Sequence, residues 1–132
     1  MTMQDVLCVC GSGRQSRACC IRFIQQDNLP NNAEELMRSR YTAYTLADIA
    51  YITKTMRSEA LVGFDPSETY TWASSVKWVR LEVLSSCKIN HDVATVEFKA
   101  YYKENGRMNI LHEKSLFEII DSQWYYVGIC KN

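Results

Sequence analysis

The chain has 132 residues, of which 47% are hydrophobic and 11% aromatic. This length and composition suit one small domain with its own core, and they exclude a chain that is disordered throughout. Fifteen Lys and Arg residues balance fifteen Asp and Glu residues. With no net charge, the sequence gives no reason to expect a nucleic acid or an anionic membrane as a partner.

The sequence contains no apolar run near the ~18 residues that a membrane-spanning helix needs. Its first residues, Met1–Leu7, also lack the basic start and the long apolar stretch of a signal peptide. We therefore expect a cytoplasmic protein without a membrane partner, in a compartment where thiols stay reduced.

Four of the six cysteines lie close together near the N-terminus, with the spacing C-x-C-x8-C-C: Cys8, Cys10, Cys19 and Cys20. Four thiolates that can converge are the ligand set of a closed, tetrahedral zinc site. Gly11 and Gly13 allow the backbone to turn sharply after the first pair. The pattern predicts a structural Zn²⁺ site with four thiolate ligands.

Other interpretations of the cysteine cluster are weaker. Disulfides between neighbouring cysteines would close small, strained rings, and the expected compartment is reducing. An iron–sulfur cluster and metal-free thiols stay open as alternatives, although the close spacing would crowd a cluster. Zn²⁺ with four thiolates carries a net charge of about −2, which three nearby cations are placed to offset: Arg14, Arg17 and Arg22. The same arginines are candidate contacts for an acidic protein or RNA.

After a polar connector at residues 26–32, the chain is helical. We expect one helix from Ala33, a second helix or a bend from Asp48 to about Met56, and a short helix from Pro66 to about Ser74. Asn32 and Glu35 can form a capping box at the start of the first helix. Asp65 followed by Pro66 marks another helix start.

From Lys77 onward the hydrophobic period changes to that of strands. Asn105-Gly106 between two alternating runs predicts a tight hairpin, and Asp121-Ser122 predicts the next turn. The interpretation is an antiparallel four-stranded meander curling over three helices, an α+β fold. Cys87 has strand spacing from Val83 and is expected in the core.

The string CVCGSGRQSRACC resembles the SEC-C motif, a zinc-binding module named after the C-terminus of the SecA translocation ATPase. Val9 and Ile21 stand where that motif usually has Pro and often has Gly. Further segments follow in the order seen in the YchJ-like family, bacterial proteins without an assigned activity: ELMRSRYTAY, TVEF, HEKSLF and WYYV. The resemblance implies a SEC-C segment at 1–26 and a nuclear-transport-factor-2-like (NTF2-like) cone at 27–132.

Relatives of the cone fold often have a cavity at the wide end of the sheet. Alternation along the third strand places Leu111, Glu113 and Ser115 on its more apolar face, which should point inward. Arg40 lies on the apolar face of the first helix. Because an unpaired buried charge is costly, we expect Arg40 and Glu113 to pair, with Ser115 or a tyrosine such as Tyr44 in the network.

Three functions remain in competition. The favoured one is a binding or adaptor protein whose SEC-C segment docks a partner protein. The second is a small-molecule receptor or enzyme that uses the cavity, although the sequence holds no complete catalytic constellation. In the third, zinc only fastens the N-terminal segment to the domain. A homodimer is compatible with each of them.

Overall fold

A computed structural model describes residues 6–130 of the chain. The outer limits of the two expected domains, residues 1–5 and 131–132, therefore lie outside the described residues. The elements in chain order are α1 (Ile21–Ile24), α2 (Ala33–Thr45), α3 (Ile49–Lys54), α4 (Pro66–Ser75), β1 (Lys77–Lys88), β2 (Val93–Glu104), β3 (Arg107–Ile120) and β4 (Gln123–Ile129), with 3-10 helices at Ser16–Ala18 and Ser58–Leu61. Within 6–130, no helix is long and apolar enough to cross a membrane.

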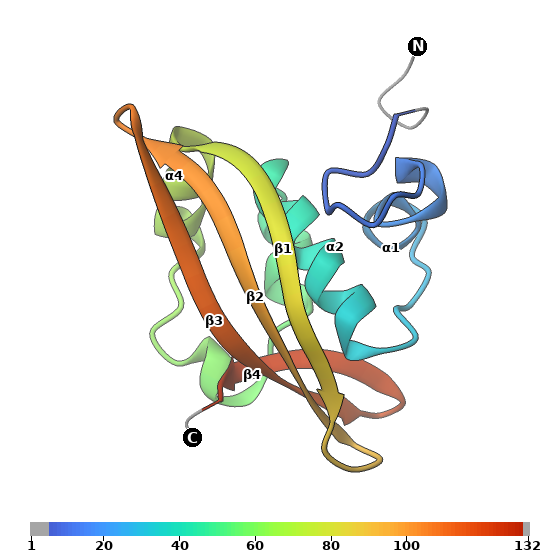
Figure 1. Cartoon of the computed structure of the whole chain (residues 1–132). Helices are drawn as coiled ribbons and strands as arrows, with labels where there is room; N and C mark the ends of the chain where they lie inside the picture. The colour runs from blue at the N-terminus through green and yellow to red at the C-terminus, as the bar shows by residue number, and fades with distance from the viewer. Residues whose placement is uncertain (1–5, 131–132) are drawn as a thin grey trace.

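The four strands form one antiparallel sheet in the order β1-β2-β3-β4, as expected for a meander. The β2–β3 hairpin turns at Asn105 and Gly106, which have φ angles of 53° and 79°. Asp121 and Ser122 make the β3–β4 turn, also with positive φ. The long strands curve, and α2 and α4 lie on their concave side (Figure 1). The expected α+β cone is thus confirmed.

The helix starts follow the capping residues of the sequence. Asn32 Oδ1 accepts the backbone N–H of Glu35 at 2.8 Å. The Glu35 carboxylate accepts a hydrogen bond from the N–H of Asn31, one residue before the position expected in a capping box. Asp65 caps α4 by accepting the N–H groups of the second and third helical residues. These side chains satisfy backbone donors that a helix N-terminus leaves unpaired.

The N-terminal segment shares the core of the domain. The four clustered cysteines are buried in one hydrophobic cluster with Leu36 and Met37 of α2 and Val96 and Phe117 of the sheet. Figure 1 shows this segment against α2, on the side away from α4. The position of the cysteine cluster is therefore fixed by α2.

A bulge in β1 determines which side chains enter the cone. The β1–β2 register shifts between Trp78 and Arg80, so that Val79 is left without a partner and is 43% exposed. Trp78 and Leu81 therefore share the concave face, although they are three residues apart. Simple alternation from Leu81 would have placed Val79 inside and Trp78 outside.

Candidate metal centre and cavity

The four cysteine sulfurs converge on one point. All four Sγ atoms lie within 4.8 Å of one another, and all four residues are buried. Cys19 Sγ is 3.6 Å from Cys10 Sγ and 3.9 Å from Cys20 Sγ. Four thiolates placed tetrahedrally around zinc at ~2.3 Å would be about 3.8 Å apart. The two separations at Cys19 match this geometry and are far too long for a disulfide bond of ~2.05 Å.

Local backbone structure brings the first pair of cysteines toward the second. Cys8 N donates to Arg14 O at 2.8 Å, which closes a loop, and Gly11 N donates to Cys8 O at 3.1 Å. Gly11 turns this loop with a φ of +82°, a conformation that side chains other than glycine rarely adopt. Cys19 and Cys20 lie between a 3-10 helix and α1. Each pair therefore sits at a turn.

Neighbouring polar groups lie around the sulfurs. Ser12 Oγ is 3.2 Å from Cys19 Sγ, and Thr42 Oγ1 of α2 is 3.9 Å from Cys8 Sγ. Arg38 of α2 donates to the carbonyl oxygen of Cys10 at 2.6 Å. Contacts of this kind orient metal ligands.

The thiols influence one another's ionisation. Hydrogen bonds from Cys10 and Cys20 hold the pKa of Cys8 well below that of a free thiol. Hydrogen bonds with Cys10 and Cys8, together with burial, raise the pKa of Cys20. Thiolates buried this close together repel one another, because each negative charge opposes the next. A divalent cation at the centre would remove this repulsion.

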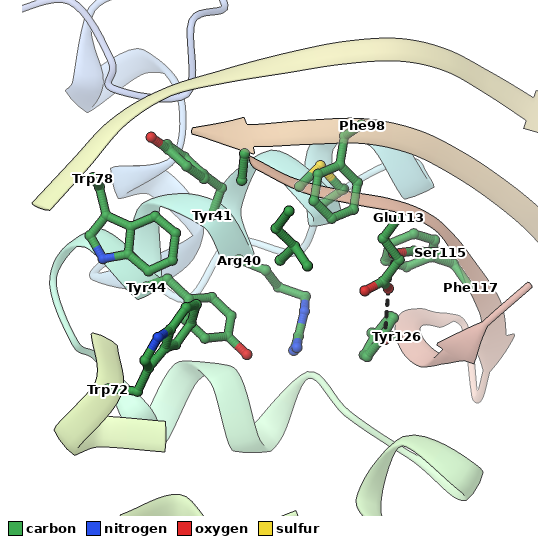
Figure 2. Close-up of a pocket in the computed structure, with 13 residues that line it drawn as sticks. Arg40, Tyr41, Tyr44, Trp72, Trp78, Phe98, Glu113, Ser115, Phe117 and Tyr126 are labelled. Carbon is green, nitrogen blue, oxygen red and sulfur yellow. Dashed lines mark hydrogen bonds between the residues drawn. The ribbon is translucent and has the colours of Figure 1, made fainter. Parts of the chain in front are cut away.

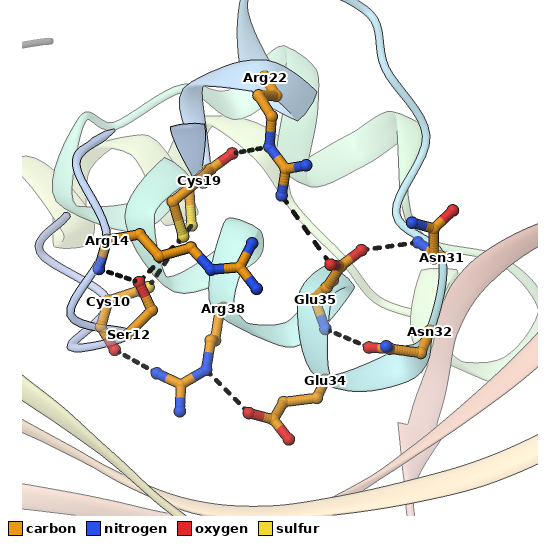
Figure 3. Close-up of polar contacts among 11 residues, drawn as sticks. Cys10, Ser12, Arg14, Cys19, Arg22, Asn31, Asn32, Glu34, Glu35 and Arg38 are labelled. Atoms are coloured by element: carbon orange, nitrogen blue, oxygen red, sulfur yellow. Dashed lines mark hydrogen bonds and ion pairs between the residues drawn. The ribbon is translucent and has the colours of Figure 1, made fainter. Parts of the chain in front are cut away.

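The arginines near the cluster occupy different environments (Figure 3). Arg22 Nε donates to the carbonyl of Cys19 at 3.0 Å, and its Nη2 is 3.9 Å from Glu35. Arg14 and Arg17 are exposed. The sequence prediction missed Arg38, which bonds both Cys10 and Glu34. The spacing of four residues between Glu34 and Arg38 was the only signal in the sequence, and it indicates only the contact with Glu34.

A second site lies inside the cone (Figure 2). A cavity of about 120 Å³ opens between α2, α4 and the concave face of the sheet. As expected from alternation, Leu111, Glu113 and Ser115 of β3 line it. Its aromatic wall includes Trp72 and Trp78, whose ring centroids are 5.3 Å apart.

Arg40 is 6% exposed and borders this cavity. Its Nη1 donates to Ile52 O at 2.9 Å and to Thr55 Oγ1 at 2.6 Å. Burial lowers the pKa of the guanidinium, yet arginine keeps its charge at neutral pH. Arg40 therefore joins α2 to the C-terminal end of α3, where a cation is favourable.

Glu113 and Arg40 border the same cavity, but the expected direct ion pair does not form among the described residues. Glu113 Oε2 instead accepts hydrogen bonds from Ser115 Oγ at 2.5 Å and Tyr126 OH at 2.8 Å. The Arg40 guanidinium lies 4.7 Å from the centroid of the Tyr126 ring. Tyr126 thus connects the two charged groups, while Tyr44 lines the cavity without a hydrogen bond to either.

The prediction that Cys87 lies in the core is wrong. Cys87 is exposed, as are all residues from Leu84 to Lys88, because this end of the β1–β2 hairpin extends beyond the helices (Figure 1). His112 is exposed on the outer face of the sheet, where its Nε2 is 2.7 Å from Glu97. Neither residue borders the metal centre or the cavity.

Residues 32–128 match a family described as YchJ, middle NTF2-like domain. The chain is 38% identical to the UPF0225 protein of Geobacter sulfurreducens, over 91% of this chain and 76% of that protein. It is 36% identical to a UPF0225 protein of Haemophilus influenzae, over 91% of this chain and 75% of that one. The chain belongs to this YchJ-like UPF0225 family.

Two solved structures of SEC-C motif-containing proteins are similar to this UPF0225 chain. The solution structure from Rhodopseudomonas palustris has a TM-score of 0.85 and 34% identity, covering 95% of this chain and 98% of that one. The crystal structure from Psychrobacter arcticus has a TM-score of 0.83 and 28% identity, covering 100% and 87%. The likeness covers the cysteine segment as well as the NTF2-like domain.

Proposed function

We propose that this UPF0225 protein is a zinc-binding docking protein, in which one structural Zn²⁺ organises residues 6–26 for contact with a partner protein. The convergence of four buried Sγ atoms within 4.8 Å is the observation that carries the proposal. Four protein thiolates would fill a tetrahedral site and leave no position for water or substrate. A centre of this kind stabilises the fold of the segment.

Zinc suits this donor set better than the alternatives. Thiolates are soft ligands that favour zinc over magnesium or calcium, and sulfurs this close can share a single ion. An iron–sulfur cluster contains several irons and sulfides and would need more space between its ligands. All six cysteines are free of disulfides, which supports a reducing, cytoplasmic setting.

Substitution of Co²⁺ for zinc tests the ligand set. We expect the wild-type chain to give the ligand-field and thiolate charge-transfer absorption of tetrahedral Co²⁺. Cys19→Ser should weaken metal binding about tenfold or more, since even the loss of a neighbour of a ligand has an effect of that size. Cys87→Ser, at an exposed position on β1, is the matched control. Equal binding by both variants would contradict the assignment.

The surface of the segment supports docking. Its charged side chains in residues 6–26 are Arg14, Arg17 and Arg22 only, with no carboxylate. Leu7 and Val9 beside them are 65% and 49% exposed. A partner with acidic and apolar side chains complements such a surface, because opposite charges steer the encounter and apolar contacts stabilise the complex that forms.

Arg14→Glu tests the docking surface, with Arg107→Glu at the far end of the β2–β3 hairpin as control. Proteins captured from cells by the wild-type chain would be purified, and their direct binding would be measured. We expect Arg14→Glu and zinc removal each to weaken binding about tenfold or more, and Arg107→Glu to leave it unchanged. Binding that resists both changes would leave zinc with the purely structural role of fastening the segment to α2.

A further inference from the structure

The cone cavity has an unusual combination of features for a hydrophobic core. Its walls are largely aromatic, including Trp72, Trp78 and Phe98, yet two side chains of opposite charge border it, Arg40 and Glu113. They do not form an ion pair with each other. Figure 2 shows Arg40 reaching in from α2 and Glu113 from β3. The space between the walls therefore has both a cationic and an anionic side.

Arg40 retains unused hydrogen-bond donors. Within residues 6–130, only Nη1 donates to protein groups, namely Ile52 O and Thr55 Oγ1. Among the described residues, no fully enclosed side-chain nitrogen or oxygen lacks a partner. Nε and Nη2 make no such bond, so they reach accessible space, and the cavity is the space that Arg40 borders. Glu113 stabilises this 94% buried cation only through space, so an anion in direct contact with the guanidinium would be favourable.

Glu113 is held in a fixed orientation with one oxygen available. Oε2 accepts hydrogen bonds from Ser115 and Tyr126, whereas Oε1 accepts none from the described residues. Burial and the nearby carboxylate raise the pKa of Tyr126, so its hydroxyl stays protonated as a donor. Oε1 is therefore an acceptor for a ligand hydroxyl or ammonium group.

We propose that the cavity binds a small carboxylate that carries a hydroxyl or ammonium group next to it and a short apolar tail. The ligand carboxylate would contact Arg40, its donor would contact Glu113, and its tail would lie against Trp72 and Trp78. The cavity of about 120 Å³ limits the size, since a cavity of ~150 Å³ holds a benzene molecule. Benzene has six non-hydrogen atoms, so a ligand of about five or six non-hydrogen atoms is the upper limit here.

The test uses the metal-loaded full chain and four probes: lactate, alanine, propionate and 1,2-propanediol. Binding is followed by NMR of the three indole N–H signals. Trp72 and Trp78 border the cavity, whereas Trp124 donates to Asn31 O outside it and is an internal control. We expect one or both donor-bearing carboxylates to shift the first two signals, with a dissociation constant of about 1 mM or lower. Propionate and the diol should bind about tenfold more weakly, because each lacks one charged contact.

Two variants locate the site. Glu113→Gln keeps the shape of the side chain but removes its charge, and it should weaken binding of the two donor-bearing carboxylates about tenfold without weakening binding of propionate. Glu97→Gln, on the outer face of the same sheet, is the matched control. Ala100→Leu should abolish binding by filling the cavity that Ala100 lines, while the Trp124 signal confirms that the variant is folded.

Any one of three results would overturn the proposal. The first is that no probe shifts the Trp72 and Trp78 signals, and the second is that all four probes bind equally. The third is that Ala100→Leu binds the probes as the wild type does. Whether the hydroxyl or the ammonium compound binds more tightly identifies the donor that the site accepts.

Discussion

Tyr51 shows how a buried side chain contributes to the pH dependence of stability. It is 3% exposed, and its hydroxyl lies 2.7 Å from Ser39 Oγ. Burial raises its pKa from 10.0 to about 12. The phenol must therefore remain protonated in the folded chain, while the unfolded chain ionises it at lower pH.

This pKa shift predicts a loss of stability at alkaline pH. Because the folded pKa is above the unfolded one, the contribution is fully present below pH 10 and is lost as pH rises from 10 to about 12. Its full size is about 3 kcal/mol. Urea unfolding across this range should show a smaller alkaline loss for Tyr51→Phe than for the wild type. Parallel curves for the two proteins would contradict the account.

Gly11 is a second residue whose local geometry has a measurable effect. It has a φ of +82°, and an added Cβ would lie 3.4 Å from Leu81 O. Gly13 has a φ of +87° with nothing within 4 Å of such an atom. The two glycines therefore share backbone strain but differ in crowding.

We expect Gly11→Ala to lower the free energy of unfolding by about 1–2 kcal/mol through backbone strain, with an added effect from crowding. Gly13→Ala should show the strain alone, so it is the matched control. Chemical denaturation of both zinc-loaded variants measures the difference. A larger effect at Gly13 would contradict this picture of the loop.

At the scale of elements, caps and turns could be predicted from the sequence, whereas the bulge could not. Asn32 and Asp65 begin their helices as expected, because capping depends on residues a few positions apart. Trp78 enters the cavity only through the register shift at Val79. That shift depends on how β1 pairs with β2 and leaves no signal in the alternation of β1 itself.

The cap of α2 makes an element-scale prediction. Asn32→Ala removes the acceptor for Glu35 N and should lower the free energy of unfolding by about 1 kcal/mol. Asn31→Ala is the control, since Asn31 contacts its neighbours through backbone atoms. Thermal or urea unfolding separates the two variants. Equal losses would show that the side chain of Asn32 is not the cap.

For the whole molecule, the sequence predicted the fold and the convergence of four cysteines, but only part of the cavity. Cys8, Cys10, Cys19 and Cys20 follow a motif whose spacing is itself informative. Arg40 and Glu113 were correctly expected to face the same space. A tyrosine was expected between them, but Tyr126 was not identified as that residue, because its position depends on where β4 meets β3 and α2. Contacts between distant elements leave little trace in local patterns.

Metal removal should affect hydrogen exchange differently in the N-terminal segment and in the sheet. After treatment with a chelator, we expect backbone amides in residues 6–26 to lose protection from hydrogen exchange, because the metal would organise their loops. Strand β2, paired on both sides, should keep most of its protection. Equal loss in both regions would show that the segment and the sheet unfold as one unit.

Elemental analysis of freshly purified native protein tests our proposal that four thiolates hold one zinc ion. We expect one zinc per chain, lost in Cys19→Ser and retained in Cys87→Ser. Protein purified without any bound metal, or with iron and inorganic sulfide in place of zinc, would contradict it.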